Sequence, residues 1–234
     1  MSAPSTPPAA DAARRPARGR PPRLDQARTV EAALVLLDES GLDALTMRRL
    51  ADAVGVQAGA LYRHFATKGD LLTAMAERML ADCSTPPPDP DWSGRLTALA
   101  RRLRTALLAH RDGARVYAGT HSTGAGTLGF AETLIGVLGE AGFGPQEAAR
   151  TALTVVHYTV GHTLEEQAAL QPGDQGPADP ERLREAVADA GLPHLTAALP
   201  VLTGTDFTAQ FEFGLGLLLR GLRGLRRDGS GPGA

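Results

Sequence analysis

Two short predicted helices, separated by a glycine turn, carry side chains that can hydrogen-bond the edges of DNA bases. Gln57, Arg63 and His64 offer donors and acceptors, whereas Leu61 and Phe65 are apolar and fall on the opposite helical face. A helix of this kind can lie in the major groove while its apolar face stays packed on its own domain. The pattern favours a helix-turn-helix that binds DNA over a small three-helix bundle with a basic surface.

The residues around this helix fit the same chemistry. Residues 58–60 read Ala-Gly-Ala, and such small side chains permit close approach to the bases and contact with a thymine methyl group. Arg48 and Arg49 stand early in the preceding helix, and Lys68 stands at the start of the next one. We expect these three cations to face the phosphate backbone.

The local signals place these residues on short, well-bounded helices. Apolar side chains at three- and four-residue spacing predict a first helix from near Asp25 to Gly41. Thr46 can cap a second helix, which Gly55 ends after about two turns. The third helix is expected over roughly residues 57–64.

The rest of the chain also has a helical period. Thr67 and Asp70 form a capping-box pattern that opens a fourth helix, and prolines at 86–90 end this segment. Further helices are expected at about 92–110, 127–141, 145–170 and 206–226, with Pro145 in a favoured first-turn position. No alternating period indicates a strand. The predicted fold class is therefore all-α, with a three-helix DNA-binding domain and a larger helical domain.

Three segments lack the apolar side chains that a core needs. Residues 1–23 are rich in Pro, Ala and Arg and are expected to form a disordered basic arm that could meet a polyanion. Residues 171–180 are expected to be a mobile linker, and residues 227–234 a flexible tail. The folded part is expected to divide into a DNA-binding domain at 24–70 and a second helical domain at 71–226.

Composition bounds the class of protein. The 234 residues are 43% hydrophobic and 21% charged, with a formal net charge of −2. No stretch approaches the roughly 20 apolar residues of a membrane-spanning helix, and the start of the chain lacks the apolar segment of a secretory signal. A single cysteine excludes a disulfide framework and a Cys-based zinc site. We expect a cytoplasmic protein with no membrane partner.

Residues 45–72, LTMRRLADAVGVQAGALYRHFATKGDLL, resemble the DNA-binding signature of the TetR family of regulators. The shared features are the T-x-R-x-L-A opening, the A-x-x-x-G-V turn and the L-Y-x-H-F-x-x-K-x-x-L ending. The resemblance implies that DNA is contacted by Arg48, Gln57, Ala58, Tyr62, His64 and Lys68. Of these, Tyr62 and Lys68 would contact mainly phosphate. Arg63 joins this set from the base-edge argument above.

The resemblance continues into the second domain. Residues 107–120, 157–167 and 211–222 are similar to matching stretches of the family's archetype, whose second domain holds tetracycline chelated to magnesium. This implies a homodimer in which the 145–170 and 206–226 helices pack against their mates as a four-helix bundle. It also implies a ligand pocket in each second domain.

The archetype's pocket positions are mostly changed. Thr120 and Glu165 match the residues near the metal, whereas Tyr117 replaces a histidine that binds it. The positions that contact the drug fall on Ser84, Leu99, Leu103 and His121. A neutral phenol is a poor Mg²⁺ ligand, and the leucines make the cavity more apolar. We expect a more apolar organic inducer, bound without obligatory Mg²⁺.

A second group of pocket residues allows another interpretation. His162 and Glu165 lie three residues apart on one helical face, with Thr120 and His121 nearby in the archetype's geometry. Such a group could coordinate a transition metal. The alternatives are a polar network that lines an organic ligand's cavity, or a solvated helix face. We expect no metal site, and expect the four residues to be polar contacts of the ligand.

The leading hypothesis is a transcriptional repressor that binds a palindromic operator as a homodimer and is released by a small-molecule inducer. One alternative is a sequence-nonspecific architectural DNA-binding protein, which the arginine-rich arm would serve. Another is a metal-responsive regulator of the same family. An enzyme is not expected, because the sequence has no Gly-rich phosphate loop, nucleophile elbow or recognisable carboxylate pair.

Overall fold

A computed structural model describes residues 25–85, 88–170 and 180–229, with side chains to residue 225. Within these ranges the regular structure consists of eleven helices and no strand, which confirms the all-α prediction. The expected arm at 1–23 and linker positions 171–179 lie outside the described residues, as does 230–234 of the expected tail. No helix in the described part is long and apolar enough to cross a membrane.

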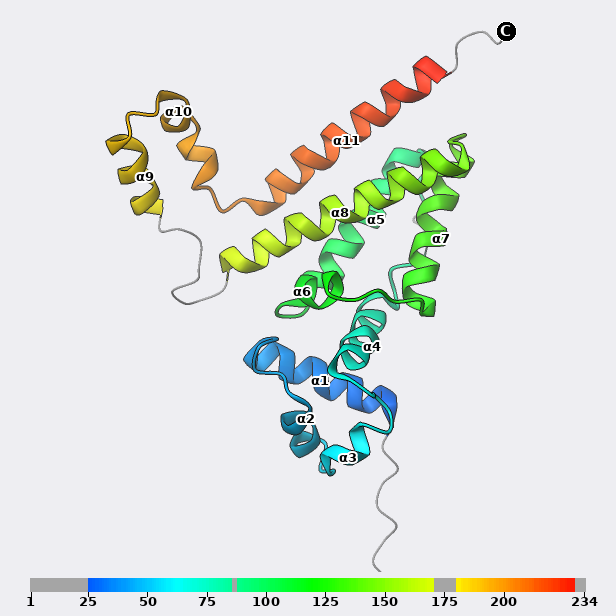
Figure 1. The fold of residues 1–234 in the computed structure, drawn as a ribbon. Coiled ribbons are helices and arrows are strands. Elements are labelled where there is room, and N and C mark those ends of the chain that lie inside the picture. Colours follow the sequence, from blue (N-terminus) through cyan, green and yellow to red (C-terminus); the bar gives the residue numbers. More distant parts are fainter. Residues whose placement is uncertain (1–24, 86–87, 171–179, 230–234) are drawn as a thin grey trace, which may run out of the picture.

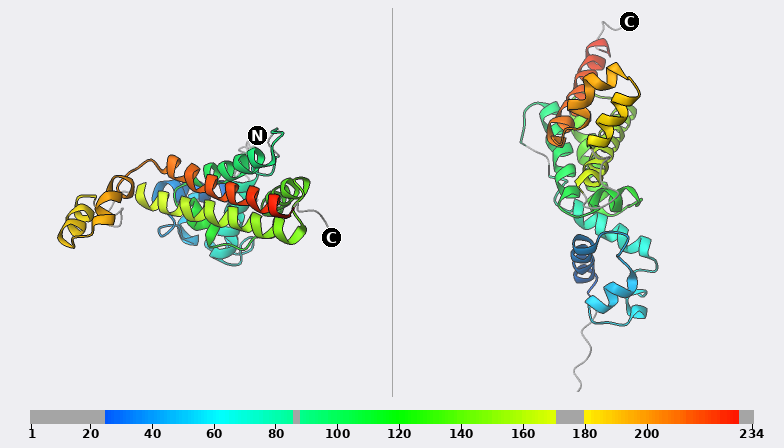
Figure 2. Two further views of the ribbon diagram at one scale, coloured as in Figure 1. Left: turned by 90° about the horizontal axis from the view of Figure 1, so that it is seen from above. Right: turned by 90° about the vertical axis from the view of Figure 1, so that its left-hand side faces the viewer.

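The first four helices form the head of an elongated molecule (Figures 1 and 2). They are α1 (Gln26–Ser40), α2 (Met47–Ala53), α3 (Ala58–Leu61) and α4 (Lys68–Leu80). Their bounds follow the predicted signals, because Asp25 and Thr46 cap α1 and α2 and the Thr67–Asp70 capping box opens α4. Gly41 ends α1 with a φ of +78°, a conformation that favours glycine.

The third helix is shorter than predicted. Its regular part covers only Ala58–Leu61, and the chain continues as turns through His64. The backbone N–H of His64 donates to the carbonyl of Leu61, three residues back, as in the tightened last turn of a helix. Gly59 in so short a helix weakens it further. The predicted DNA-facing residues therefore occupy both the helix and the turn after it.

The remaining helices form the body. They are α5 (Trp92–Leu108), α6 (Gly113–Ala118), α7 (Ala125–Glu140), α8 (Pro145–Leu170), α9 (Pro180–Asp189), α10 (Pro193–Leu202) and α11 (Phe207–Gly229). The four predicted long helices are present with ends shifted by a few residues. Three helices were not predicted: α6 has only six residues, α9 buries only one side chain, and α10 buries none and contains Pro200.

One apolar core joins the head to the body. α4 leaves the head and packs against α5, α6 and α7, and its buried residues Met75 and Leu80 belong to the same cluster as Leu37 and Leu99. α8 and α11 lie side by side along the far side of the body, and α9 and α10 project away from it (Figures 1 and 2). A displacement of α4 would therefore be felt in both parts.

Candidate DNA interface and ligand pocket

The end of the head presents a helix-turn-helix. The turn between α2 and α3 contains Gly55 at a φ of +69°, and the N–H of Val56 donates to the carbonyl of Ala51 at 3.0 Å. Leu61 and Phe65 are almost fully buried and fix α3 on the head's core. The opposite side of α3 consequently faces away from the molecule.

Four of the predicted DNA-contacting residues are exposed on this outer side: Gln57, Tyr62, Arg63 and His64. Within the described residues their side chains form no hydrogen bond or ion pair, and Tyr62 is 51% exposed despite the apolar area of its ring. Ala58 is half-buried at the start of α3. The structure thus brings five predicted residues to one tip, with their polar groups available to an external partner.

The predicted phosphate contacts differ in whether their side chains already form hydrogen bonds within the chain. Arg48 is exposed, and its side chain forms no bond within the described residues. Arg49 donates to the carbonyl of Ala44 at 3.0 Å, and Lys68 donates through Nζ to the carbonyl of Leu42 at 3.2 Å. An ammonium has three donors, so Lys68 keeps two for an anion while it ties the start of α4 to the loop after α1.

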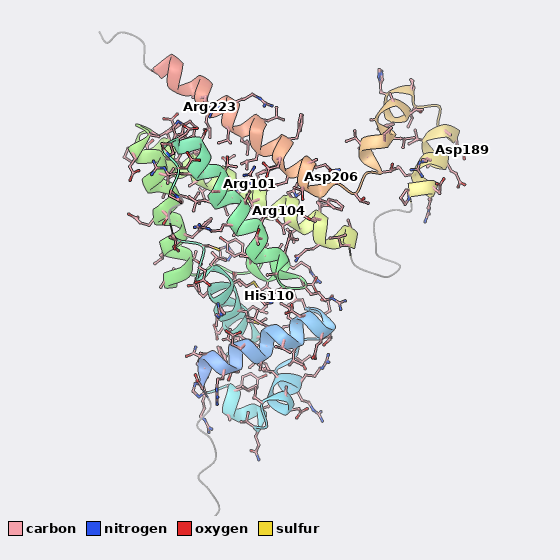
Figure 3. All side chains as sticks on the ribbon, turned by 180° about the vertical axis from the view of Figure 1, so that it is seen from behind. Arg101, Arg104, His110, Asp189, Asp206 and Arg223 are labelled. Atoms are coloured by element: carbon pink, nitrogen blue, oxygen red, sulfur yellow. The ribbon has the colours of Figure 1, made fainter. Side chains whose placement is uncertain are left out.

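The turn between α5 and α6 connects the body to the head. Asp112, almost fully buried, accepts a 2.8 Å hydrogen bond from the backbone N–H of Leu42. In return, Asp38 of the head accepts from the N–H of Arg111 at 2.9 Å and lies 3.0 Å from Nδ1 of His110. His110 marks this junction beside α1 in Figure 3. The contacts fix the position of the head on the body.

A cavity of about 460 Å³ lies between the α6–α7 segment and α8. Its apolar lining includes Leu153, Val156, Val160 and Leu164 of α8. Its polar lining consists of hydroxyl and imidazole groups from Tyr117, Thr120, His121, Ser122, Thr127 and His157. Three predicted ligand contacts (Tyr117, Thr120 and His121) are therefore brought together, with His157 as an unpredicted fourth.

The other predicted ligand contacts lie elsewhere in the single chain. Leu99 and Leu103 are fully buried in the apolar core, and Glu165 is exposed on α8. Ser84 follows α4, where its carbonyl accepts a 2.7 Å hydrogen bond from Thr133 Oγ1. None of these four predicted residues lines the cavity.

His162 belongs to a buried polar network instead. Arg104 makes a two-bond ion pair with Glu166, at 2.8 and 2.7 Å, and its guanidinium lies 5.2 Å from the centre of the Phe211 ring. The His162 ring packs edge-on against Phe211, and its Nδ1 is 3.8 Å from the Glu166 carboxylate. Burial, assisted by Arg104, lowers the pKa of His162 despite this carboxylate. Figure 3 shows Arg104 and Arg101 extending from α5 towards α11.

Sequence reasoning missed four residues that the structure makes functional candidates. His157 lines the cavity, and Arg104 and Glu166 form the buried ion pair. The Glu77 carboxylate accepts hydrogen bonds from the backbone at the start of α7. The register of α8 held a usable signal for Glu166, because Thr159, Thr163 and Glu166 follow the same buried three- and four-residue spacing. That register leaves Glu165 exposed. Arg104 and Glu77 carried no comparable signal, since their partners are 62 and 49 or 50 residues away in the chain.

The cavity's donor set does not fit a magnesium-chelated ligand. Hard cations prefer carboxylate, carbonyl or water oxygens, and the cavity's described lining contains no carboxylate side chain. Burial, with the nearby Glu77 charge, raises the pKa of Tyr117, so its phenol stays protonated. The described part of the chain also contains no group of three His, Cys, Asp or Glu residues placed to hold a metal ion.

Comparisons with known proteins match both parts of the chain. A family model described as bacterial regulatory proteins of the tetR family matches residues 30–75, and a tetracyclin repressor-like C-terminal domain matches residues 85–226. The tetracycline repressor protein class A from transposon 1721 of Escherichia coli is 42% identical over 217 residues, which are 90% of this chain and 97% of that protein.

Solved structures agree. A possible TetR family transcriptional regulator from Streptomyces coelicolor A3(2) is 67% identical with a TM-score of 0.80, covering 86% of this chain and all of that one. BioQ, solved with its natural double-stranded DNA operator, is 30% identical with a TM-score of 0.63, covering 85% of this chain and 98% of that one. The predicted resemblance is confirmed over both domains. The chain belongs to the tetR family of bacterial regulatory proteins and is a transcriptional regulator, not an enzyme.

Proposed function

We propose that this chain is a ligand-responsive repressor that binds a palindromic DNA operator as a homodimer and is released when a small molecule enters the body. One observation carries the proposal: the same apolar core supports unbonded base-reading side chains at the head and a cavity of about 460 Å³ in the body. The repressor name of the Escherichia coli relative and the operator complex of BioQ support it.

The proposed DNA-binding domain spans residues 24–70, and its contacts divide by chemistry. Hydrogen-bonding and small side chains of the helix-turn-helix would read bases, whereas Tyr62 and Lys68 would mainly bind phosphates. The base-reading set comprises Gln57, Ala58, Arg63 and His64. Arg48 joins this set instead of the phosphate contacts, because its exposed side chain, unlike those of Arg49 and Lys68, has no partner within the described residues. The arm at 1–23 would add phosphate contacts beside this domain.

The proposed dimer uses the far side of the body, within the ligand-binding and dimerisation domain at 71–226. Leu153, Phe213 and Leu217 are each more than half exposed along α8 and α11, and a hollow of about 650 Å³ runs between these helices. The projecting α9–α10 segment exposes Val201 and Leu202 as well. A second copy that covers this apolar surface would carry a second head, and two heads read two half-sites.

The proposed ligand is an apolar organic molecule with a few polar groups, bound without obligatory Mg²⁺. The leucine and valine wall of α8 would take its apolar part, and Thr120, His121 and His157 would bind its polar groups. In the single chain His162 and Glu165 do not line the cavity, so they are not among these proposed ligand contacts. A metal-responsive regulator gains no support from this arrangement, because His121 and His162 face different surroundings.

Tetracycline tests the ligand proposal directly. A buried polar group left unpaired costs about 1–3 kcal/mol, so the changed positions are expected to weaken tetracycline binding by orders of magnitude. Calorimetric titration of the purified protein with tetracycline and Mg²⁺, repeated with EDTA, should give binding weaker than micromolar in both cases. Micromolar or tighter binding that EDTA abolishes would contradict the proposal.

Selection of duplexes from a random DNA pool tests the repressor proposal, followed by footprinting on the selected site. One short palindrome protected above background is expected, with two protomers per duplex. Uniform protection along any DNA would instead support the nonspecific architectural protein. The proposed location is the cytoplasm, where a bacterial regulator meets its DNA.

A further inference from the structure

Glu77, in the last turn of α4, places its carboxylate against the start of α7. One oxygen accepts from the backbone N–H of Gly126 at 2.7 Å, and the other accepts from the N–H of Thr127 at 3.1 Å and from its hydroxyl. The Ser122 hydroxyl also bonds to this carboxylate. A single side chain of the helix that leaves the head thus satisfies two of the free N–H groups at the start of a body helix.

The start of α7 is shaped for this carboxylate. A Cβ atom added at Gly124 would lie 2.4 Å from the Glu77 carboxyl carbon, and one added at Gly126 would lie 2.9 Å from the Glu77 carbonyl oxygen. Both distances are shorter than real contacts allow. Gly124 has an ordinary φ of −77°, so its backbone does not require glycine and the close approach of Glu77 is the local reason for the missing side chain.

The charge on Glu77 contributes to the contact. Burial opposes ionisation, but the hydrogen bonds from Ser122 and Thr127 and from the backbone of residues 126–127 outweigh it and hold the pKa of Glu77 below its usual value. A negative charge at a helix N-terminus is also favoured by the helix dipole. The carboxylate therefore binds this segment more strongly than a neutral group would.

The partners of Glu77 form the wall of the ligand cavity. Ser122 and Thr127 both line it, next to Thr120 and His121 of the same segment. Figure 1 shows the α6–α7 segment passing over α4 before it enters α7. A ligand that displaces Ser122 or Thr127, or competes for their hydroxyls, would act on the bonds to Glu77.

The other end of α4 is fixed to the DNA-binding head. Lys68, nine residues before Glu77 and roughly 13 Å away along a helix, bonds to the loop that follows α1. Arg78, next to Glu77, bonds to Glu31 of α1. A continuous hydrogen-bonded helix thus connects the cavity wall to α1, which packs on α2, and α2 packs on α3 in turn.

We propose that Glu77 is the positioning residue that couples the cavity wall to the DNA-binding head, which rests on the proposed repressor function. With its bonds to the α7 start intact, occupancy of the cavity and binding of DNA influence each other through α4. Because coupling is reciprocal, operator binding must then change the stability of the cavity wall. This consequence can be measured without knowing the inducer.

The experiment compares hydrogen–deuterium exchange of residues 120–128 in the full-length dimer with and without a duplex selected from the random pool. Glu77→Gln removes the charge and one acceptor, and Gly124→Ala pushes the carboxylate away without changing α4. Gly136→Ala is the matched control on the same helix, because an added Cβ there meets nothing within 4 Å. Circular dichroism and sedimentation establish that each variant is folded and dimeric.

In the wild type and Gly136→Ala, the operator is expected to change the exchange rate of this segment by at least about fivefold. In Glu77→Gln and Gly124→Ala the segment should exchange faster overall, but equally with and without bound operator. If Glu77 only capped α7, its variants would exchange faster, but the operator would change their exchange rate by the same factor as in the wild type. That result would overturn the coupling. An operator-independent rate in the wild type would overturn it too.

These outcomes separate the two proposals. If the wild type binds the selected palindrome and Glu77→Gln keeps the wild-type ratio, the repressor proposal stands and the coupling role falls. If the selection gives no palindrome, the repressor proposal falls, and the coupling role falls with it.

Discussion

The head and the body place their functional polar groups in opposite ways. In the head, Arg48, Gln57 and His64 are exposed, and within the described residues their side chains have no partner. In the body, Arg104 bonds to Glu166, and the start of α7 bonds to the carboxylate of Glu77 on α4, the helix that leaves the head. The tip of the head therefore offers unpaired groups to a partner, whereas these charged groups of the body are bonded to each other or to the backbone.

This difference teaches what each part can do. Unpaired groups on a packed core can bind a surface without rearrangement, which suits a rigid reading surface. Internal pairs next to a cavity can exchange partners when a ligand enters, and an exchange of partners changes the relative position of helices. Four predictions test the contrast, from the largest expected effect to the smallest.

The largest effect is expected when the buried pair of the body is broken. Glu166→Ala leaves the Arg104 guanidinium buried beside Phe211 without its carboxylate, and the loss of one member of a buried pair typically costs about 3–5 kcal/mol of folding free energy. Urea unfolding followed by circular dichroism measures this loss.

The exposed ion pair of Arg101 with Glu212 is the control for this experiment. It also starts from α5, which it joins to α11 where the buried pair joins α5 to α8, but its side chains are 57% and 35% exposed. Glu212→Ala should therefore cost at most about 1 kcal/mol. Equal losses in the two variants would contradict the idea that burial makes the body's pairs important.

The head should respond in binding and not in stability. Arg48→Ala or His64→Ala is expected to weaken binding to the selected palindrome by about 1–3 kcal/mol, with little effect on a shuffled duplex. Arg49→Ala is the neighbouring control, since Arg49 is already bonded to Ala44 and is assigned to phosphates. Fluorescence anisotropy on both duplexes measures the effects. Equal losses on both duplexes for all three variants would show that none of them reads bases.

Lys68 should have a smaller, sequence-independent effect. Lys68→Ala removes one phosphate contact, so it is expected to weaken all duplexes alike and to reduce the salt slope by about 1. Lys68→Gln, which keeps a donor for the Leu42 carbonyl, separates the loss of charge from the loss of this internal bond. A salt slope equal to that of the wild type in both variants would remove Lys68 from the interface.

The smallest effect concerns pH. Because burial lowers the pKa of His162 below its ordinary 6.5, the unfolded chain binds this proton more readily than the folded one. The free energy of unfolding should therefore fall as the pH drops below about 6.5, and His162→Leu should remove this part of the fall. Urea unfolding between pH 5 and pH 8 measures it. A steeper fall in His162→Leu than in the wild type would contradict this account of the network.

The head could be predicted from sequence because its signals are local. The Thr67–Asp70 capping box, the cap at Thr46 and the glycine turns each involve residues within a few positions of one another, and the structure shows all of them. The side of α3 that faces outward follows from Leu61 and Phe65, since burying these two residues turns the polar ones away from the core.

The body could be predicted only in part because its site depends on long-range packing. Leu99 and Leu103 fell on pocket positions of the archetype, yet they fill the core here. The cavity wall comes from the short α6 and the segment after it, which no periodic pattern marked. His157 shares one face of α8 with Val156 and Val160, but nothing near it in the sequence shows that this face lines a cavity.

The most direct test of the account is the ratio of dissociation constants for the selected palindrome and a shuffled duplex of the same composition, measured by anisotropy at one salt concentration near 0.15 M. If the head reads bases, the dimer should bind the palindrome about 10³-fold or more tightly than the shuffled duplex. Equal affinity for the two duplexes would contradict the account, because the exposed side chains of α3 would then bind DNA without reading its sequence.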